Sequence, residues 1–132
     1  MSHIYKSALL PLLVVLSGCA GLTGFTGADA GTRMGDWVEF NVSHPGLTVK
    51  IIEPFSQDLA PISTVGKTSP SPLRHTVTFG RTTDLHTLEI VGRYHKDVYL
   101  DGQFYASLWT GDVVIKEGLI SIDGKLLPQI KN

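Results

Sequence analysis

Residues 98–127 read VYLDGQFYASLWTGDVVIKEGLISIDGKLL, and this stretch decides the fold. The pairs Asp101-Gly102, Glu117-Gly118 and Asp123-Gly124 separate short runs rich in β-branched and aromatic residues. Asp followed by Gly favours a type I′ hairpin turn. Both central positions of that turn need a positive φ, which Asp and Gly tolerate. The stretch therefore predicts consecutive antiparallel strands joined by tight turns.

A two-residue turn also predicts which residues face one another across each hairpin. The turn at Asp101-Gly102 places Tyr99 opposite Phe104, Val98 opposite Tyr105, and Tyr94 opposite Trp109. The two later turns place one common set of apolar residues on a single face, namely Val113, Ile115, Ile120, Ile122 and Leu127. Two turns that predict the same face support each other.

Upstream of this stretch, apolar and polar residues alternate with a period of two, as in half-buried strands. The pattern covers residues 37–42, 48–53, 75–79 and 87–94. In the last of these segments it places Leu88, Ile90 and Tyr94 on one face, and Gly92 within it suggests a bulge or a close backbone approach. We expect an all-β domain over residues 34–132, a small antiparallel sandwich or partly closed barrel of six to eight strands.

One long segment, residues 54–74, interrupts this pattern with four prolines among Ser and Thr residues. Loops of this length inside compact domains are usually functional or disordered. As a binding loop it would offer a set of candidate contact residues: Phe55, Leu59, Ile62, Lys67 and Arg74. The alternatives are a variable connection without a ligand and a short edge strand over residues 59–65.

Aromatic residues form a second candidate binding surface. Tyr94, Tyr105 and Trp109 share a face in the predicted register, which would give an aromatic patch for protein or glycan contact. The alternative is that this face belongs to the core and the opposite face is exposed. Adjacent Phe104 and Tyr105 must in either case point to opposite sides of their strand.

The chain begins MSHIYKSALLPLLVVLSGC, with Lys6 ahead of an apolar run that closes on Leu16-Ser17-Gly18-Cys19. Cys19 is the only cysteine. This segment resembles the signal peptide and lipobox of bacterial lipoproteins. The resemblance implies cleavage between Gly18 and Cys19 and a lipid on the Cys19 sulfur. It also implies the outer membrane as the address, because Ala rather than Asp follows the cysteine.

Residues 20–33 read AGLTGFTGADAGTR, and glycine at this density resists regular structure. The sequence therefore predicts three parts: a signal peptide over 1–18, a lipidated cysteine with a flexible tether over 19–33, and a single β domain over 34–132. An internal disulfide is excluded because the chain has one cysteine.

Motifs for catalysis, cofactors or nucleic acid are not apparent. There is no G-x-S-x-G nucleophile motif, and the formal net charge of −1 gives no electrostatic case for nucleic acid. His75, His86 and His95 lie in or beside consecutive predicted strands, where they could meet as metal ligands. We favour separate histidines, because no metal-binding spacing connects them.

The expected function is that of a non-catalytic, lipid-anchored outer-membrane lipoprotein. Its β domain would bind another envelope protein, as an accessory of an envelope or secretion assembly. The alternatives are an inhibitor or exclusion factor acting on an envelope enzyme or receptor, and a metal protein or enzyme that uses the three histidines.

Overall fold

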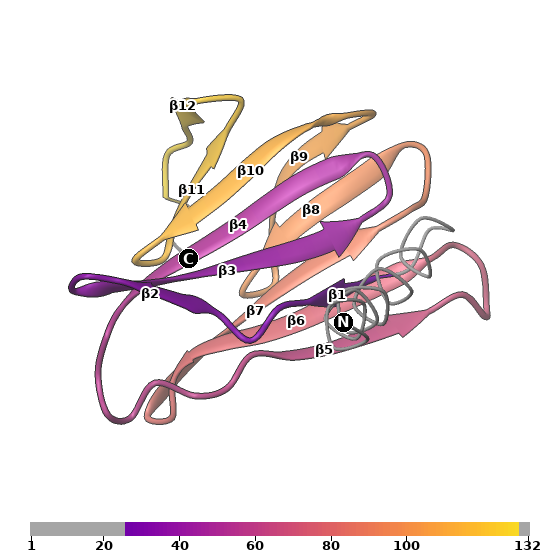
Figure 1. Ribbon diagram of the computed structural model, residues 1–132. Coiled ribbons are helices and arrows are strands. Elements are labelled where there is room, and N and C mark those ends of the chain that lie inside the picture. Colours follow the sequence, from indigo (N-terminus) through magenta and orange to yellow (C-terminus); the bar gives the residue numbers. More distant parts are fainter. Residues whose placement is uncertain (1–25, 130–132) are drawn as a thin grey trace, which may run out of the picture.

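The computed structural model describes residues 26–129, which form two sheets packed face to face in a sandwich-like all-β fold (Figure 1). The first sheet contains β1 (Gly27–Ala28), β2 (Thr32–Met34), β3 (Trp37–His44), β4 (Leu47–Pro54), β10 (Gly111–Lys116), β11 (Leu119–Ile122) and β12 (Lys125–Leu126). The second sheet contains β5 (Ser63–Lys67), β6 (Arg74–Arg81), β7 (Asp84–Val91), β8 (Lys96–Leu100) and β9 (Gln103–Leu108).

The strand order of the first sheet is β1-β3-β4-β10-β11-β12, and β2 pairs with β3 beside β1. The second sheet follows the chain from β5 to β9. All-β architecture is thus confirmed, but the described residues hold twelve strands rather than six to eight. The excess comes mainly from short segments, β1, β2 and β12, that pair along longer neighbours.

The core lies between the sheets and follows the predicted alternation. In β3 and β4 every second side chain is buried, and the same period continues in β6, β7 and β8. The apolar face predicted from the last two turns is also confirmed. Val113, Ile115, Ile120 and Ile122 are buried, and Leu127 packs against them. Burial of these side chains is the main favourable contribution to folding.

All three predicted turns have the backbone that a type I′ turn requires. The φ angles are 51° and 81° at Asp101-Gly102, 51° and 78° at Glu117-Gly118, and 52° and 83° at Asp123-Gly124. Ile115 faces Ile120 as predicted. The last hairpin also has the predicted register, with Leu127 N donating to Ile120 O over 2.9 Å.

The register of the β8–β9 hairpin is only partly as predicted. Tyr99 faces Phe104, but an irregularity between Val98 and Tyr99 shifts the pairing, so that Val98 faces Ala106 instead of Tyr105. One extra residue in one strand shifts all pairs beyond it. The predicted pairing of Tyr94 with Trp109 is wrong, because β8 begins at Lys96 and β9 ends at Leu108.

One pair of neighbouring strands is parallel, contrary to the expectation of a wholly antiparallel fold. β10 lies beside β4 with Val113 opposite Val49 and Ile115 opposite Ile51. The chain reaches this position by crossing from the second sheet back to the first after β9. The C-terminal third therefore completes the first sheet.

The flexible tether predicted for residues 19–33 ends earlier than residue 33. Gly27 and Ala28 pair with Ser43 and Val42, and residues 32–34 pair with residues 37–39 of β3. Glycine-rich sequence joins a sheet here because the edge of β3 offers unpaired backbone groups. The signal peptide, the lipobox and the first part of the tether lie outside the described residues.

The sandwich has two different ends, which we name by one residue of each. The Lys96 end carries the β3–β4 turn, the loop of residues 92–95, and residues 109–110 between β9 and β10. The Asp101 end carries the β2–β3, β6–β7, β8–β9 and β10–β11 turns. β1 pairs with Ser43, next to His44, so the described chain begins near the Lys96 end.

Candidate functional site

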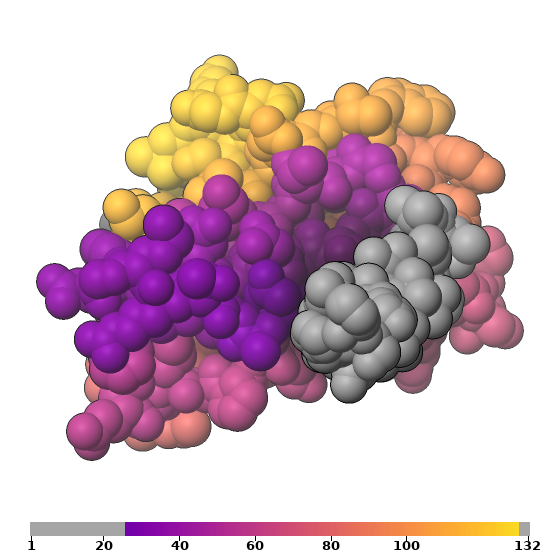
Figure 2. Space-filling model, in the orientation of Figure 1, coloured from indigo at the N-terminus to yellow at the C-terminus, as the bar shows by residue number. Residues whose placement is uncertain are grey.

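An open apolar groove lies toward the Asp101 end, between the first sheet and the segment that follows β4. It encloses about 500 Å³ and is lined mainly by Ala30, Val38, Phe40, Phe55, Leu59 and Pro61. In the view of Figure 2 the magenta segment after β4 borders the indigo N-terminal strands on the surface. The groove therefore exposes the edge of the core at the open side of the sandwich.

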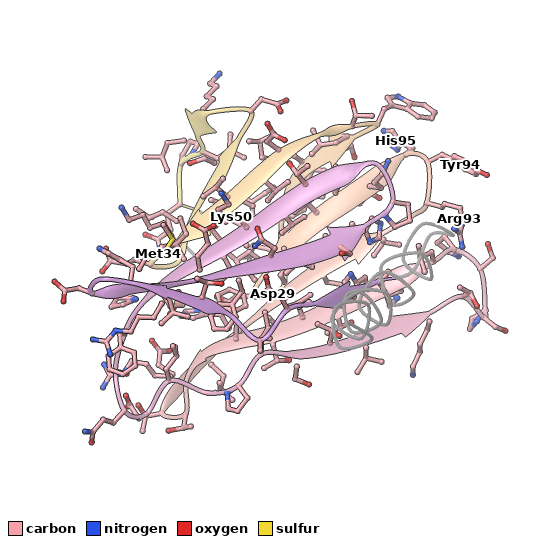
Figure 3. The ribbon with its side chains drawn as sticks, in the orientation of Figure 1. Asp29, Met34, Lys50, Arg93, Tyr94 and His95 are labelled. Carbon is pink, nitrogen blue, oxygen red and sulfur yellow. The ribbon has the colours of Figure 1, made fainter. Side chains whose placement is uncertain are left out.

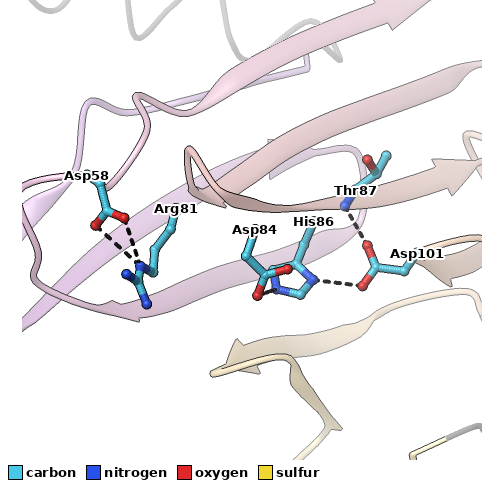
Figure 4. Close-up of polar contacts among 6 residues, drawn as sticks. All are labelled: Asp58, Arg81, Asp84, His86, Thr87 and Asp101. Atoms are coloured by element: carbon cyan, nitrogen blue, oxygen red, sulfur yellow. Dashed lines mark hydrogen bonds and ion pairs between the residues drawn. The ribbon is translucent and has the colours of Figure 1, made fainter.

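Backbone hydrogen bonds hold the lining segment against both sheets. Phe55 N donates to Asp36 O over 2.8 Å at its start, and Ala60 N donates to Gly80 O over 2.8 Å near its end. An ion pair of 3.1 Å between Arg81 Nε and Asp58 Oδ2 adds to the second attachment (Figure 4). Hydrogen bonds from Ser56 and Arg81 keep the pKa of Asp58 below its usual value. The groove is thus fixed at both ends of its wall.

A positively charged side chain, that of Arg33, lies beside Phe55 at the rim of the groove. The guanidinium carbon of Arg33 lies 3.7 Å from the centroid of the Phe55 ring, within the range of a cation–π contact. Arg33 Nε also donates to Gly35 O over 2.9 Å. Phe55 remains 44% exposed. The groove is therefore an apolar surface with the positive charge of Arg33 at its edge.

At the Lys96 end, polar side chains occupy inward-facing positions of the strands. Lys96 is buried, and its Nζ donates to the backbone oxygens of Tyr94 and Trp109. His44 and His75 are also buried, and their rings stack with centroids 5.7 Å apart. These residues tie the β3–β4 turn, the loop before β8 and the β9–β10 connection into one unit.

The two stacked histidines favour their neutral forms. Burial lowers the pKa of His44, and this effect outweighs the hydrogen bond of 2.9 Å between its Nε2 and Gly92 O. Burial, together with neighbouring His44, lowers the pKa of His75 to about 4. Burial also lowers the pKa of Lys96. Among residues 26–129, neither ring nitrogen of His75 has a hydrogen-bond partner.

Above this buried cluster, aromatic side chains are exposed. Tyr94 is 73% exposed and Trp109 is 66% exposed. The rings of His95 and Trp109 meet edge to face, 5.3 Å apart. Figure 3 shows Tyr94 and His95 at the end of the molecule opposite Met34, with Tyr94 pointing away from the sandwich. We call Tyr94, His95 and Trp109 the end patch.

A histidine and several carboxylates meet at the Asp101 end (Figure 4). His86 Nδ1 lies 2.8 Å from Asp101 Oδ2, and His86 Nε2 lies 3.7 Å from Asp84 Oδ2. Burial lowers the pKa of His86, but Asp101 and then Asp84 outweigh it and raise that pKa above its usual value. Burial raises the pKa of nearby Glu53. Asp101 also accepts from Thr87 N over 2.9 Å, so the cluster fastens the β8–β9 turn to β7.

The candidates in residues 54–74 have different environments. Phe55 and Leu59 line the groove, whereas Ile62 packs against the core and Lys67 is exposed at the end of β5. Arg74 pairs with Glu89 over 2.9 Å. The suggested edge strand exists but is shifted, since β5 covers Ser63–Lys67 and Leu59 forms an isolated bridge with Arg81.

The predicted strand face shared by Tyr94, Tyr105 and Trp109 is wrong, because Tyr94 and Trp109 lie outside the strands. Tyr94 and Trp109 lie at one end, but Tyr105 packs against the core, because Tyr105 and Phe104 point to opposite sides of β9. Tyr94 does not share a strand face with Leu88 and Ile90, because β7 ends at Val91. Gly92 lies directly after β7, and the predicted close backbone approach exists there.

The three histidines considered as metal ligands are separated. His75 stacks with His44, His86 pairs with Asp101, and His95 contacts Trp109. Within residues 26–129, no three His, Cys, Asp or Glu residues are grouped so that they could hold a metal ion. The same residues contain no helix long and apolar enough to cross a membrane.

The buried role of Lys96 and the rim position of Arg33 were not predicted. Lys96 could have been found by extending the alternation of Val98 and Leu100 back by two residues, which places Lys96 on the buried face. The alternation of residues 37–42 places Val38 and Phe40 on one face of a strand, and the structure shows that both are buried and also line a groove.

Comparison with known proteins gives no relative on which to test these sites. No protein-family model, curated protein or solved structure matches the chain.

Proposed function

We propose that this protein is a non-catalytic, lipid-anchored lipoprotein of the bacterial outer membrane, and that its β domain binds an apolar segment of another envelope protein in the groove. The anchor is the lipid on Cys19, which the lipobox at Leu16-Ser17-Gly18-Cys19 supports. Two or more acyl chains on one protein give stable anchoring, whereas a single chain is marginal.

The observation that carries the binding role is the groove beside Phe55 and Leu59. Its walls are apolar, its volume is about 500 Å³, and its lining segment is fastened to both sheets. A preformed site loses less conformational entropy on binding than a mobile loop does. Arg33 at the rim offers a guanidinium to a carbonyl or carboxylate of the bound segment.

A non-catalytic role is supported by the chemistry of the described side chains. The polar cluster of His86, Asp84 and Asp101 links β7 to a turn, and its hydrogen bonds are used in that link. The polar cluster at the Lys96 end is buried. Neither cluster opens into the groove.

The first experiment tests the anchor. Mass spectrometry of the protein extracted from membranes should show the loss of residues 1–18 and the added mass of a lipid on Cys19. A Cys19→Ala variant should lose the lipid and leave the detergent phase on phase partitioning. An intact leader or a bare thiol in the native protein would contradict the proposal.

The second experiment tests the groove in intact cells. A photo-crosslinking amino acid at Gln57, an exposed residue of the groove, should give one discrete adduct with an envelope protein. The same amino acid at exposed Lys125 of β12 serves as the matched control and should not give that adduct.

The substitution Phe55→Ala should weaken the Gln57 adduct strongly, since Phe55 lines the groove. Leu85→Ala removes a comparably exposed apolar side chain outside the groove and should leave the adduct unchanged. Equal yields from both variants, or equal adducts from Gln57 and Lys125, would rule out the groove as the binding site.

A further inference from the structure

The end patch stands close to the point where the anchored chain joins the fold. β1 pairs Gly27 with Ser43, and the neighbouring residue His44 belongs to the buried cluster beneath Tyr94 and Trp109. The first described strand therefore lies toward the end of the sandwich that carries the β3–β4 turn and the β7–β8 loop (Figure 1), and Tyr94 belongs to that loop.

The length of chain between Cys19 and Gly27 limits how the domain can stand on a bilayer. Eight residue steps span at most about 28 Å when fully extended. A glycine-rich chain of this length has a mean span of about 16 Å. Six residue steps separate Ser43, the partner of Gly27, from Trp37 at the other end of β3, and at ~3.3 Å per step they span about 20 Å.

These lengths favour one orientation over the other. With Cys19 held at the bilayer, the Lys96 end can reach the lipid headgroups while the connecting chain keeps its mean span. If the Asp101 end faced the lipid, Gly27 would stand about 20 Å away, and the connecting chain would have to stretch beyond its mean span. A chain that is stretched beyond its mean span loses conformational entropy.

The chemistry of the Lys96 end fits a lipid headgroup layer. Tyr and Trp are the residues that concentrate at membrane interfaces, because each has an apolar ring and a polar group. Tyr94 and Trp109 are the two most exposed large apolar side chains of the described residues. Arg93 and Tyr94 also line a shallow depression of about 270 Å³ with Thr68 and Ser71.

We propose that the end patch is a membrane-contact surface, in which Tyr94 and Trp109 insert into the headgroup layer of the membrane that holds the lipid on Cys19. This inference rests on the proposed anchor. It orients the domain with the Lys96 end on the bilayer and the groove away from it. Lys96 keeps both aromatic residues in place through their backbone oxygens.

The contact depends on aromatic side chains more than on net charge. Asp112 and Asp123 lie at the start of β10 and beyond β11, on the first sheet at the same end, and they offset Arg93 and Lys67. We therefore expect contact with zwitterionic phosphatidylcholine as well as with anionic lipid, and only a small effect of salt.

The chain contains one tryptophan at each end, which gives a matched pair of probes. Trp37 begins β3 at the Asp101 end, and Trp109 lies in the end patch. The full lipidated protein is reconstituted into phosphatidylcholine vesicles as Trp37→Phe, which leaves Trp109, and as Trp109→Phe, which leaves Trp37. Fluorescence quenching by lipids with a nitroxide on the headgroup is then measured.

We expect Trp109 to be quenched several-fold more than Trp37. Adding Tyr94→Ser should reduce the quenching of Trp109, whereas adding Phe104→Ser, at an exposed residue near the Asp101 end, should not. Equal quenching of the two tryptophans in a protein that carries its lipid would overturn the inference and leave the anchor standing. A protein whose mass shows no lipid on Cys19 would overturn both.

Discussion

At the scale of single residues, polar side chains define both ends of the core. His44, His75 and Lys96 occupy inward positions at one end, and Glu53 occupies one at the other. A buried polar group without a partner destabilises a fold. Lys96 meets two carbonyl oxygens, whereas His75 meets none, so the two residues contribute differently to stability.

Titration of His75 makes the stability depend on pH in a defined direction. The unfolded chain binds a proton at His75 near pH 6.5, but the folded chain binds it only near its lowered pKa of about 4. Between these values the unfolded state holds more protons, so stability falls as the pH drops from 6.5 to 4. The loss from this residue is up to about 3 kcal/mol.

Urea unfolding at several pH values measures this effect. The difference in unfolding free energy between the native protein and His75→Leu should change through that window. It should be constant above pH 7. His44, whose pKa is also lowered, remains in the variant and leaves a smaller slope in the same direction. Identical pH profiles for the two proteins would show that His75 does not titrate in this way.

Gly92 is a position where only glycine fits. Its φ is +114°, and a Cβ there would lie 2.0 Å from the backbone oxygen of His95. We expect Gly92→Ala to destabilise the protein by at least about 2 kcal/mol. The backbone at His95 must move to make room for the Cβ, and the alanine must also adopt a strained φ. Gly102→Ala is the control, since its φ is also positive but nothing lies within 4 Å of the new Cβ.

Thermal or urea unfolding compares the two alanine variants. The unfolding free energy of Gly102→Ala should fall only by the cost of a left-handed backbone at alanine, about 1–2 kcal/mol. A smaller loss for Gly92→Ala than for Gly102→Ala would show that the loop before β8 relaxes to accept a side chain.

At the scale of elements, hairpins and faces could be predicted from sequence because their signals are local. Asp-Gly and Glu-Gly set the turns, and alternation sets the buried face of β3, β4 and β6. The shifted register at Val98 could not be predicted, because a bulge depends on packing across the sheet. The parallel pairing of β4 with β10 joins segments far apart in sequence, and no local pattern specifies it.

The candidate site residues also fall into those that local sequence indicates and those that depend on tertiary structure. Phe55 and Leu59 could be proposed because large apolar residues in a proline-rich loop suggest a surface role, whereas Tyr94 and Trp109 follow from a predicted cross-strand pairing that is wrong. Which of the candidates line one groove depends on how residues 55–61 cross between the sheets. That crossing is a tertiary feature, so Ile62 and Tyr105 could not be separated from the true surface residues.

Glu117 is the least suitable residue in the three tight turns. It adopts a φ of +51°, a region that Asn and Asp tolerate better than Glu. We expect Glu117→Asn to raise the unfolding free energy by about 0.5–1 kcal/mol. Asp123→Asn changes a residue that already suits its turn and should have a smaller effect. If urea unfolding gives Glu117→Asn the same unfolding free energy as the native protein, this interpretation of the β10–β11 turn is wrong.

At the scale of the whole molecule, the two sheets place their most buried strands at the centre and their short strands at the edges. β4 lies between β3 and β10, and β7 lies between β6 and β8, whereas β5 and β12 each end a sheet. Local opening of edge strands costs less free energy than opening of central strands. Stability should therefore vary across the fold in a predictable order.

Native-state hydrogen exchange measures that order. Amides of β4 and β7 should exchange most slowly, with protection close to the global unfolding free energy. Amides of β12 and the outer positions of β5 should exchange fastest among the strands. Equal protection in β5 and β7 would show that β5 is held by more than its pairing with β6.

The pairing of β1 with the edge of β3 also determines how the domain bears mechanical load. Tension applied between the start of β1 and the turns at the Asp101 end acts along the strand axes. The interstrand hydrogen bonds lie across that direction, so many of them must shear together instead of breaking one after another. A fold that is loaded in this direction resists tension without unravelling strand by strand.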